Sequence, residues 1–196
     1  MNALTEHIKS EIKSINIFEM VLTVVVAVAI GVAFWGWTFV YEMLKPFLKL
    51  VGLNYLSAGF WIFASVLLSK IVQKPSIAII ASLVAALIES LLTHWGMMTL
   101  VWGLVQGLGA ELVFLSFNYK KWDLKVLILA ASLSTIFSYT LDYFLYDYHS
   151  LSMSIVLVQV TTYVLSSALL AGYLSEVLSR RLKRLGLLEQ FKIAKE

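Results

Sequence analysis

Cysteine is absent from this chain of 196 residues, and charged residues make up only 14% of it. Without cysteine the chain has no disulfide framework, no thiolate metal site and no cysteine nucleophile. The three histidines, His7, His94 and His149, lack the spacing of metal ligands. Phosphate-binding loop motifs are also missing, so the sequence predicts neither a metal nor a cofactor.

Hydrophobic residues make up 60% of the chain, and its mean hydropathy is +0.87. This composition lies outside the range of soluble globular proteins and within that of membrane proteins. No long linker or low-complexity run divides the sequence, so we expect a single membrane domain over residues 1–196. The net charge of +3 follows the expected membrane topology and does not indicate nucleic-acid binding.

Six apolar segments approach or exceed the roughly 17–25 residues that a helix needs to cross a bilayer. The predicted fold is therefore all-α, an integral membrane bundle of six transmembrane helices. The expected spans are 17–41, 57–72, 76–92, 97–117, 124–146 and 151–178, followed by a basic tail over 179–196. Turn or helix-breaking signals such as Lys45-Pro46 separate them. Because the segment before the first span is polar and amphipathic, we expect that span to be kept rather than cleaved.

Basic residues are distributed unevenly between the two sides of the predicted bundle. Nearly all of the 15 Lys and Arg residues precede the first span, flank the links from span two to three and from four to five, or follow span six. Only Lys45 and Lys49 fall on the other side. Since cytoplasmic segments are enriched in Lys and Arg, both termini are expected to be cytoplasmic. The outer side is rich in aromatic residues, which an interfacial belt also explains.

Five acidic or amide side chains fall inside the predicted spans: Glu89, Gln106, Glu111, Asp142 and Gln159. A carboxylate at membrane depth costs free energy, so a functional role is the first interpretation of such residues. Glu111 lies roughly 20 Å along its helix from the outer end, at a rise of about 1.5 Å per residue. For Glu111, contact with a ligand and a structural role therefore both stay open.

The fifth span contains a polar stripe. Thr135, Ser138, Tyr139, Asp142 and Tyr146 follow the spacing of one helical face. Such a stripe must face protein or water rather than lipid. For Thr135 and Ser138 we favour hydrogen bonds between helices, and for Asp142 and Tyr146 we favour a binding cavity near the outer end.

Other candidate binding residues lie toward the predicted outer side. Glu89 can neutralise a cation, and Trp95 can offer that cation an aromatic face. Gln106 has the donors and the acceptor that suit the edge of a heterocycle. The full set of expected ligand-binding residues is Trp35, Tyr41, Glu89, His94, Trp95, Gln106, Glu111, Asp142, Tyr146, Gln159 and Tyr163. None of them forms a nucleophile–base–orienter set, so we predict no enzyme.

Small residues form two pairs on the first span, Ala27 with Gly31 and Ala29 with Ala33. Pairs of this spacing allow helices to pack closely. They predict either internal packing or a docking face for another membrane subunit. The glycines of the fourth span likewise allow close helix packing or leave room for a ligand. The basic tail is expected to bind anionic lipid headgroups.

Three stretches of the sequence form a recognisable pattern: His94-Trp95-Gly96 … Gly103-Leu104-Val105-Gln106-Gly107-Leu108-Gly109-Ala110-Glu111-Leu112-Val113-Phe114, Phe34-Trp35-Gly36 and Gly59-Phe60-Trp61. Together they resemble the YkoE-type membrane proteins. These are substrate-capture (S) components of energy-coupling factor vitamin transporters. The resemblance covers nearly the whole chain. It implies a six-helix bundle in a prokaryotic plasma membrane that binds thiamine, or its hydroxymethylpyrimidine precursor, near the outer face. It also implies a coupling subunit that docks on the small residues of the first span, and a pair of ABC-type ATPases.

Two other functions compete with this one. A small membrane enzyme would use Glu89 or Asp142 as a general acid or base on a lipid or isoprenoid substrate. A stand-alone carrier would favour internal repeats, which the two halves do not show. The capture subunit is preferred because of the resemblance and the missing catalytic geometry. The thiazolium cation would compensate the acidic side chains, which favours thiamine over its precursor while leaving the choice open.

Overall fold

The computed structural model describes residues 15–50, 52–191 and 193, and this part of the chain contains helices and links but no β-strand. The predicted all-α class is therefore confirmed. Its six helical segments are α2 (Ile17–Leu50); η1 (Ala58–Ile62) with α3 (Phe63–Val72); α4 (Ile77–Leu92); η2 (Gly96–Met98) with α5 (Thr99–Ser116); α6 (Leu124–Leu145); and α7 (Met153–Ser167), which continues through the π-helical turn η4 (Ala168–Tyr173) into α8 (Leu174–Arg184). The short turn η3 (Tyr148–Ser150) joins α6 to α7.

Helix α2 differs most from its expected range, because it continues past Tyr41 and through Pro46 to Leu50. The break expected at Lys45-Pro46 is therefore absent. Proline removes one intrahelical hydrogen bond, but a helix can continue past it with a bend. The apolar residues that follow Pro46 prolong the helix by a further turn.

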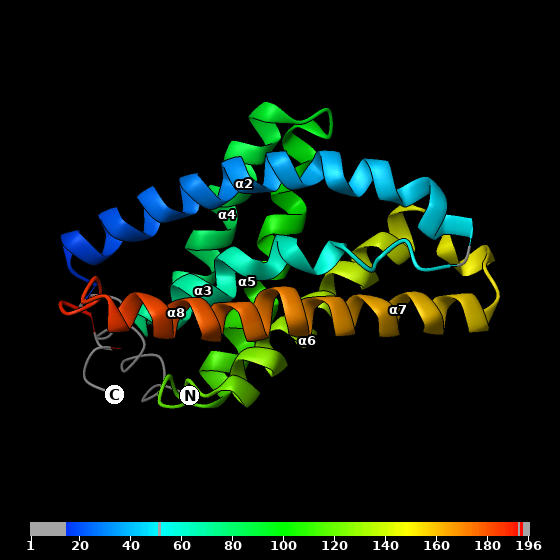
Figure 1. The fold of residues 1–196 in the computed structure, drawn as a ribbon. Helices are drawn as coiled ribbons and strands as arrows, with labels where there is room; N and C mark the ends of the chain where they lie inside the picture. The colour runs from blue at the N-terminus through cyan, green and yellow to red at the C-terminus, as the bar shows by residue number, and fades with distance from the viewer. Residues whose placement is uncertain (1–14, 51, 192, 194–196) are drawn as a thin grey trace, which may run out of the picture.

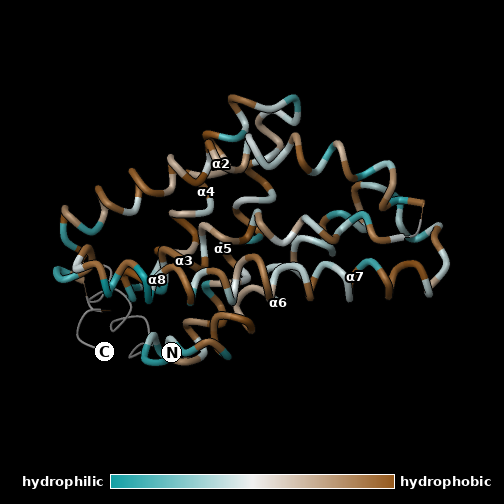
Figure 2. Tube along the Cα trace, in the orientation of Figure 1, coloured by the Kyte–Doolittle hydropathy of each residue, from teal (hydrophilic) through white to brown (hydrophobic). Residues whose placement is uncertain are grey.

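Four helices are long and apolar enough to cross a membrane: Ile17–Leu50, Gly96–Ser116, Leu124–Leu145 and Met153–Arg184. Two other apolar helices, Ala58–Val72 and Ile77–Leu92, are shorter. All residues of α3 are buried, so protein rather than lipid surrounds it and its length need not match the bilayer. In Figure 2 the hydrophilic colours gather at the ends of helices and in the links.

Glycines bring α4 and α5 into close contact. A Cβ atom built on Gly103 would lie 2.5 Å from the Cβ of Ala86, and one built on Gly107 would lie 2.8 Å from the Cα of Ile79. Any larger residue would force the helices apart, so these positions need glycine. Of the two roles predicted for the glycines of this span, the structure supports close helix packing.

The start of α2 and the end of α8 lie at the same end of the bundle, on the left in Figure 1. There the rings of Phe18 and Phe191 stack with their centroids 5.5 Å apart. Lys74, in the link between α3 and α4, forms a 2.7 Å ion pair with Glu19 of α2. We call this the terminal end of the bundle.

The opposite end contains the link over residues 52–57 and the turn between α6 and α7, on the right in Figure 1. We call it the distal end.

Two expectations lie outside the described residues, namely the amphipathic segment before the first span and the last part of the basic tail. The first described residues of the expected tail are still helical, because α8 extends to Arg184.

Candidate functional site: a polar and aromatic cluster at the distal end

Asp142, in the last turn of α6, is the centre of a hydrogen-bonded group at the distal end. One of its carboxylate oxygens accepts a hydrogen bond from the Tyr55 hydroxyl at 2.8 Å, and the other accepts from the Trp102 indole nitrogen at 2.7 Å. The hydroxyl oxygens of Tyr55 and Tyr148 also lie within hydrogen-bond distance, 3.3 Å apart. Residues from α5, from the link over 52–57 and from η3 therefore meet around the buried carboxylate.

Tyr55 and Tyr148 lie in links outside the spanning helices. Burial raises the pKa of both hydroxyls above the ordinary value for tyrosine, and the negative charge of Asp142 raises them further. Both hydroxyls therefore stay protonated at neutral pH. As a result, Tyr55 acts as a hydrogen-bond donor to the carboxylate.

Glu89, in the last turns of α4, is the second buried carboxylate of this region and is only 1% exposed. Its Oε1 accepts a hydrogen bond from the Trp61 indole nitrogen at 2.6 Å and a longer one from the Thr38 hydroxyl at 3.4 Å. Three helices therefore hold this side chain: α2 through Thr38, η1 through Trp61, and α4 itself.

Three aromatic rings contact one another beside Glu89. The ring centroid of Trp61 lies 5.1 Å from that of Tyr41 and 5.5 Å from that of Trp95, both in edge-to-face geometry. The centroids of Tyr41 and Trp95 are 6.2 Å apart. Because Trp61 donates to Glu89, these three rings form one aromatic group next to that carboxylate.

Two amide side chains complete the cluster. The Gln159 Oε1 accepts a hydrogen bond from the Tyr139 hydroxyl at 2.8 Å, and its Nε2 donates to Asn54 at 3.2 Å. Gln106 donates to the Ser138 hydroxyl at 3.1 Å. Tyr163, one turn along the helix from Gln159, is buried and stacks on Tyr55 with centroids 4.9 Å apart.

We call these residues the distal cluster: Thr38, Tyr41, Asn54, Tyr55, Trp61, Glu89, Trp95, Trp102, Gln106, Ser138, Tyr139, Asp142, Tyr148, Gln159 and Tyr163. The charge of this cluster depends on which groups donate hydrogen bonds to its two carboxylates. Both carboxylates are bonded to indole and hydroxyl groups, and neither takes part in an ion pair among the described residues. Neutral donors stabilise a negative charge without cancelling it. The cluster can therefore accept a cation.

Besides Glu111, three of the expected ligand-binding residues lie away from this cluster or at its edge. Trp35 is 39% exposed and packs edge-to-face against Phe39 on the outside of α2. His94 is exposed, and its ring contacts that of Trp95. Tyr146 is 57% exposed and stacks on Trp102 at the rim.

Glu111 belongs to the terminal end. Its carboxylate accepts hydrogen bonds from the backbone N–H groups of Ser76, at 2.6 Å, and Ala78, at 3.2 Å, where α4 begins. It also accepts from the Tyr119 hydroxyl at 2.7 Å. Burial, followed by the charge of Glu111, raises the pKa of Tyr119, which keeps that hydroxyl a donor. Because these N–H groups have no partner within α4, the geometry favours the structural alternative for Glu111.

The sequence did not single out several residues that complete the cluster. Trp102 lies one turn before Gln106 on the same helical face, and this spacing could have indicated its role. Trp61 is one of the outer aromatic residues, for which an interfacial belt is as good an explanation as a binding site. Tyr55, Asn54 and Tyr148 lie in links, where periodicity provides no signal.

The four small residues expected to dock a partner divide between two faces of α2. Ala27 and Gly31 are buried, and a Cβ atom on Gly31 would lie 2.6 Å from the carbonyl oxygen of Ala85 in α4. Of the two alternatives predicted for this pair, the structure favours internal packing. Ala29 and Ala33 are exposed, so only they are available to a partner.

The described part of the chain contains no group of three or more His, Cys, Asp or Glu side chains that could hold a metal ion.

Comparisons with known proteins agree with this architecture. Residues 18–137 match the family described as "ABC-type cobalt transport system, permease component". The chain is 38% identical over 139 residues, 70% of each chain, to the "Putative HMP/thiamine permease protein YkoE" of Bacillus subtilis (strain 168). A solved structure described as an S-component of an ECF transporter superposes with a TM-score of 0.88 and 32% identity, over 93% of this chain and 92% of the other.

Proposed function

The chain belongs to the YkoE-type substrate-binding S components of energy-coupling factor transporters, and we propose that its distal cluster captures thiamine or the hydroxymethylpyrimidine precursor of thiamine. One observation carries the proposal: two buried carboxylates in a membrane helix bundle are bonded only to neutral donors among the described residues. A permanent organic cation supplies the charge that this arrangement lacks. The name of the Bacillus subtilis relative points to the same pair of compounds.

Glu89 is the proposed partner of the thiazolium ring. Trp61, which donates to its carboxylate, packs against the rings of Tyr41 and Trp95, and aromatic faces attract organic cations. The attraction between the two charges is strengthened because the carboxylate is almost fully removed from water. Closely packed indole rings also suit a flat, delocalised cation better than a small hydrated metal ion.

Asp142, Gln106 and Gln159 are the proposed partners of the aminopyrimidine. An exocyclic amino group donates hydrogen bonds that a carboxylate can accept, and ring nitrogens accept hydrogen bonds from amide or indole groups. Trp102 and Tyr55 already direct such donors toward this region. The precursor would occupy this half of the site alone and would leave Glu89 without a cation.

We further propose that the terminal end faces the cytoplasm. Lys70, Lys74, Lys120 and Lys121 lie in or beside links at this end, together with the basic residues of α8, whereas Lys45 and Lys49 lie at the far end of α2. Basic residues concentrate on the cytoplasmic side of membrane proteins. The cell membrane of a prokaryote is the proposed location, and the distal cluster would then open toward the outside.

Energy for transport would come from other subunits, because the sequence contains no nucleotide-binding motif. The proposed partners are a transmembrane coupling subunit and ABC-type ATPases. The proposal assigns no catalysis to the chain, whose role is to bind and release its ligand.

Isothermal titration calorimetry of the purified protein with thiamine and then with hydroxymethylpyrimidine tests the function. The proposal expects saturable binding, tighter for thiamine, and recovery of the ligand unchanged when it is analysed by mass spectrometry. A membrane enzyme would instead convert its ligand to a product. If neither compound binds, the assigned ligand is wrong.

The exposed pair Ala29 and Ala33 is the proposed contact with the coupling subunit. Ala29→Leu combined with Ala33→Leu should reduce cellular thiamine uptake at least roughly tenfold, because larger side chains keep helices apart. Thiamine binding by the purified variant should be unchanged. The matched control is Val24→Leu, on another exposed flank of α2. Equal uptake by the control and the double variant would contradict the contact.

A further inference from the structure

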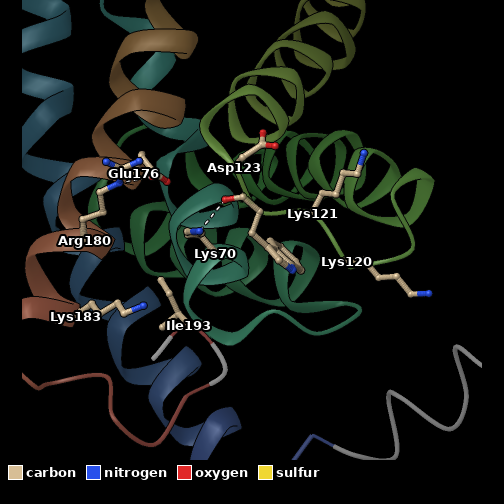
Figure 3. A pocket seen from close by; sticks show the side chains of 9 residues that line it. Lys70, Lys120, Lys121, Asp123, Glu176, Arg180, Lys183 and Ile193 are labelled. Carbon is tan, nitrogen blue, oxygen red and sulfur yellow. Dashed lines mark hydrogen bonds and ion pairs between the residues drawn. The ribbon is translucent and has the colours of Figure 1, made fainter. Parts of the chain in front are cut away.

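A pocket of about 550 Å³ lies at the terminal end, far from the distal cluster. Figure 3 shows side chains from α8 on one side of it, Lys70 of α3 in the middle, and the link between α5 and α6 on the other side. Lys120 and Lys121 extend outward from its rim. The lining residues are Lys70, Lys120, Lys121, Trp122, Asp123, Glu176, Arg180, Lys183 and Ile193.

The lining of this pocket carries more positive than negative charge, with five basic side chains and two acidic ones. Lys70 is held in place, since its Nζ donates to the carbonyl oxygen of Trp122 at 2.7 Å. Asp123 uses one oxygen to cap the start of α6 through the N–H of Val126. The pocket therefore favours an anionic ligand.

Glu176 adds a more specific requirement. The side chain is 6% exposed, and its Oε1 accepts a hydrogen bond from the Nε of Arg180 at 2.5 Å. Its Oε2 is buried and has no hydrogen-bond partner among the residues that the structure describes. Buried polar atoms are nearly always paired, so this oxygen indicates a missing donor. A ligand that matches the pocket combines a negative charge with hydrogen-bond donors.

The segments around the pocket also present apolar side chains to the outside. Leu129 of α6 is 51% exposed, and Leu169 and Tyr173 of the π-helical turn are 63% and 53% exposed. The α6 helix and this turn pack together, since a Cβ atom on Gly172 would meet Ile128 at 3.0 Å. The charged pocket thus borders an apolar surface, as the headgroup region of a bilayer borders its hydrocarbon.

We propose that this pocket binds the headgroup of an anionic glycerophospholipid of the phosphatidylglycerol type. Its phosphate is held by Lys70, Arg180 and Lys183, and its glycerol hydroxyls supply the donor that Glu176 lacks. The acyl chains extend along the apolar surface of α6 and the π-helical turn. This inference requires a membrane-embedded chain but does not depend on which vitamin the distal cluster binds.

Native mass spectrometry and lipid titration of the full chain in detergent micelles test the site. Phosphatidylglycerol should bind, and phosphatidylcholine, which lacks both the net charge and the hydroxyl donors, should bind much more weakly. The test variant combines Lys121→Gln with Lys183→Gln, which removes two charges without touching the bonds of Lys70. Its affinity for phosphatidylglycerol should fall roughly tenfold.

The matched control combines Lys45→Gln with Lys49→Gln, which removes the same charge at the far end of α2. It should bind phosphatidylglycerol like the unaltered chain. Both variants should keep the thermal unfolding midpoint of the unaltered chain, and the test variant should also keep its thiamine affinity, which separates loss of the lipid site from loss of the fold.

Three outcomes would overturn the proposal. Equal phosphatidylglycerol affinity in the test and control variants would show that the pocket is not the lipid site. Equally tight binding of soluble glycerophosphoglycerol would assign the pocket to a free phosphodiester. Unchanged lipid binding with lost co-purification of the coupling and ATPase subunits would assign it to an acidic protein partner.

Discussion

The two ends of the bundle use buried carboxylates in different ways. At the terminal end, Glu19 is paired with Lys74, and Glu111 caps the backbone at the start of α4. At the distal end, Glu89 and Asp142 are as deeply buried, but indole and hydroxyl groups are their donors. Burial is similar, so burial alone does not identify a binding residue. The partners of each carboxylate make the distinction.

This difference has an energetic consequence. A carboxylate paired with lysine or with helix N–H groups has its charge compensated within the protein, and removing it costs stability. A carboxylate held by neutral donors keeps an uncompensated charge, which a cationic ligand can neutralise. Substitutions at the terminal end should therefore affect folding, and substitutions at the distal end should affect binding.

The largest effect is expected from Glu89→Gln. Removing one partner of a buried charge pair typically costs about 2–5 kcal/mol, so thiamine affinity should fall roughly 100-fold. Hydroxymethylpyrimidine has no cation to lose and should change only a few-fold. Calorimetric titration of both compounds measures the two ratios, and equal losses would contradict the role of Glu89 as counter-charge.

A smaller effect, on stability rather than binding, is expected from Glu111→Ala. This change leaves the N–H groups of Ser76 and Ala78 without their partner and should lower the free energy of unfolding by about 2 kcal/mol. Denaturant titration in micelles measures the loss. Thiamine affinity of the folded variant should stay within about twofold of the original. A large loss of affinity with normal stability would assign Glu111 to the binding site instead.

The smallest effect is expected from Tyr55→Phe. It deletes the hydroxyl that donates to Asp142 and keeps the ring stacked on Tyr163. One hydrogen bond to a charged group contributes about 1 kcal/mol or more, so the affinity for both ligands should change roughly fivefold. Tyr173→Phe, on an exposed ring at the terminal end, is the control and should leave affinity unchanged. Identical affinities for the two variants would remove Tyr55 from the site.

The sequence predicted the helical class and most of the helix boundaries because apolar length and breaker residues are local signals. The Asp142 stripe was also predictable, since residues of one helical face share a fixed spacing. Pro46 was misjudged because proline near a helix end does not always stop the helix. The spacing of neighbouring residues can indicate a polar helix face, but it cannot indicate which side chains pack against that face.

The partners of the acidic residues were not predictable for the same reason. The N–H groups that bind Glu111 lie more than 30 residues away in the sequence. Trp61 and Glu89 are similarly distant, and an outer tryptophan is as typical of an interfacial belt as of a binding site. Only the fold brings these groups together, so the sequence left both roles of Glu111 open.

The most direct test of the central claim compares thiamine with an uncharged analogue of the same shape, in which a neutral thiophene ring replaces the thiazolium. Both compounds are titrated calorimetrically into the unaltered protein. If the distal carboxylates supply the counter-charge, thiamine should bind at least roughly tenfold more tightly than the neutral analogue. Equal or tighter binding of the neutral analogue would contradict the claim that uncompensated charge at the distal end selects the ligand.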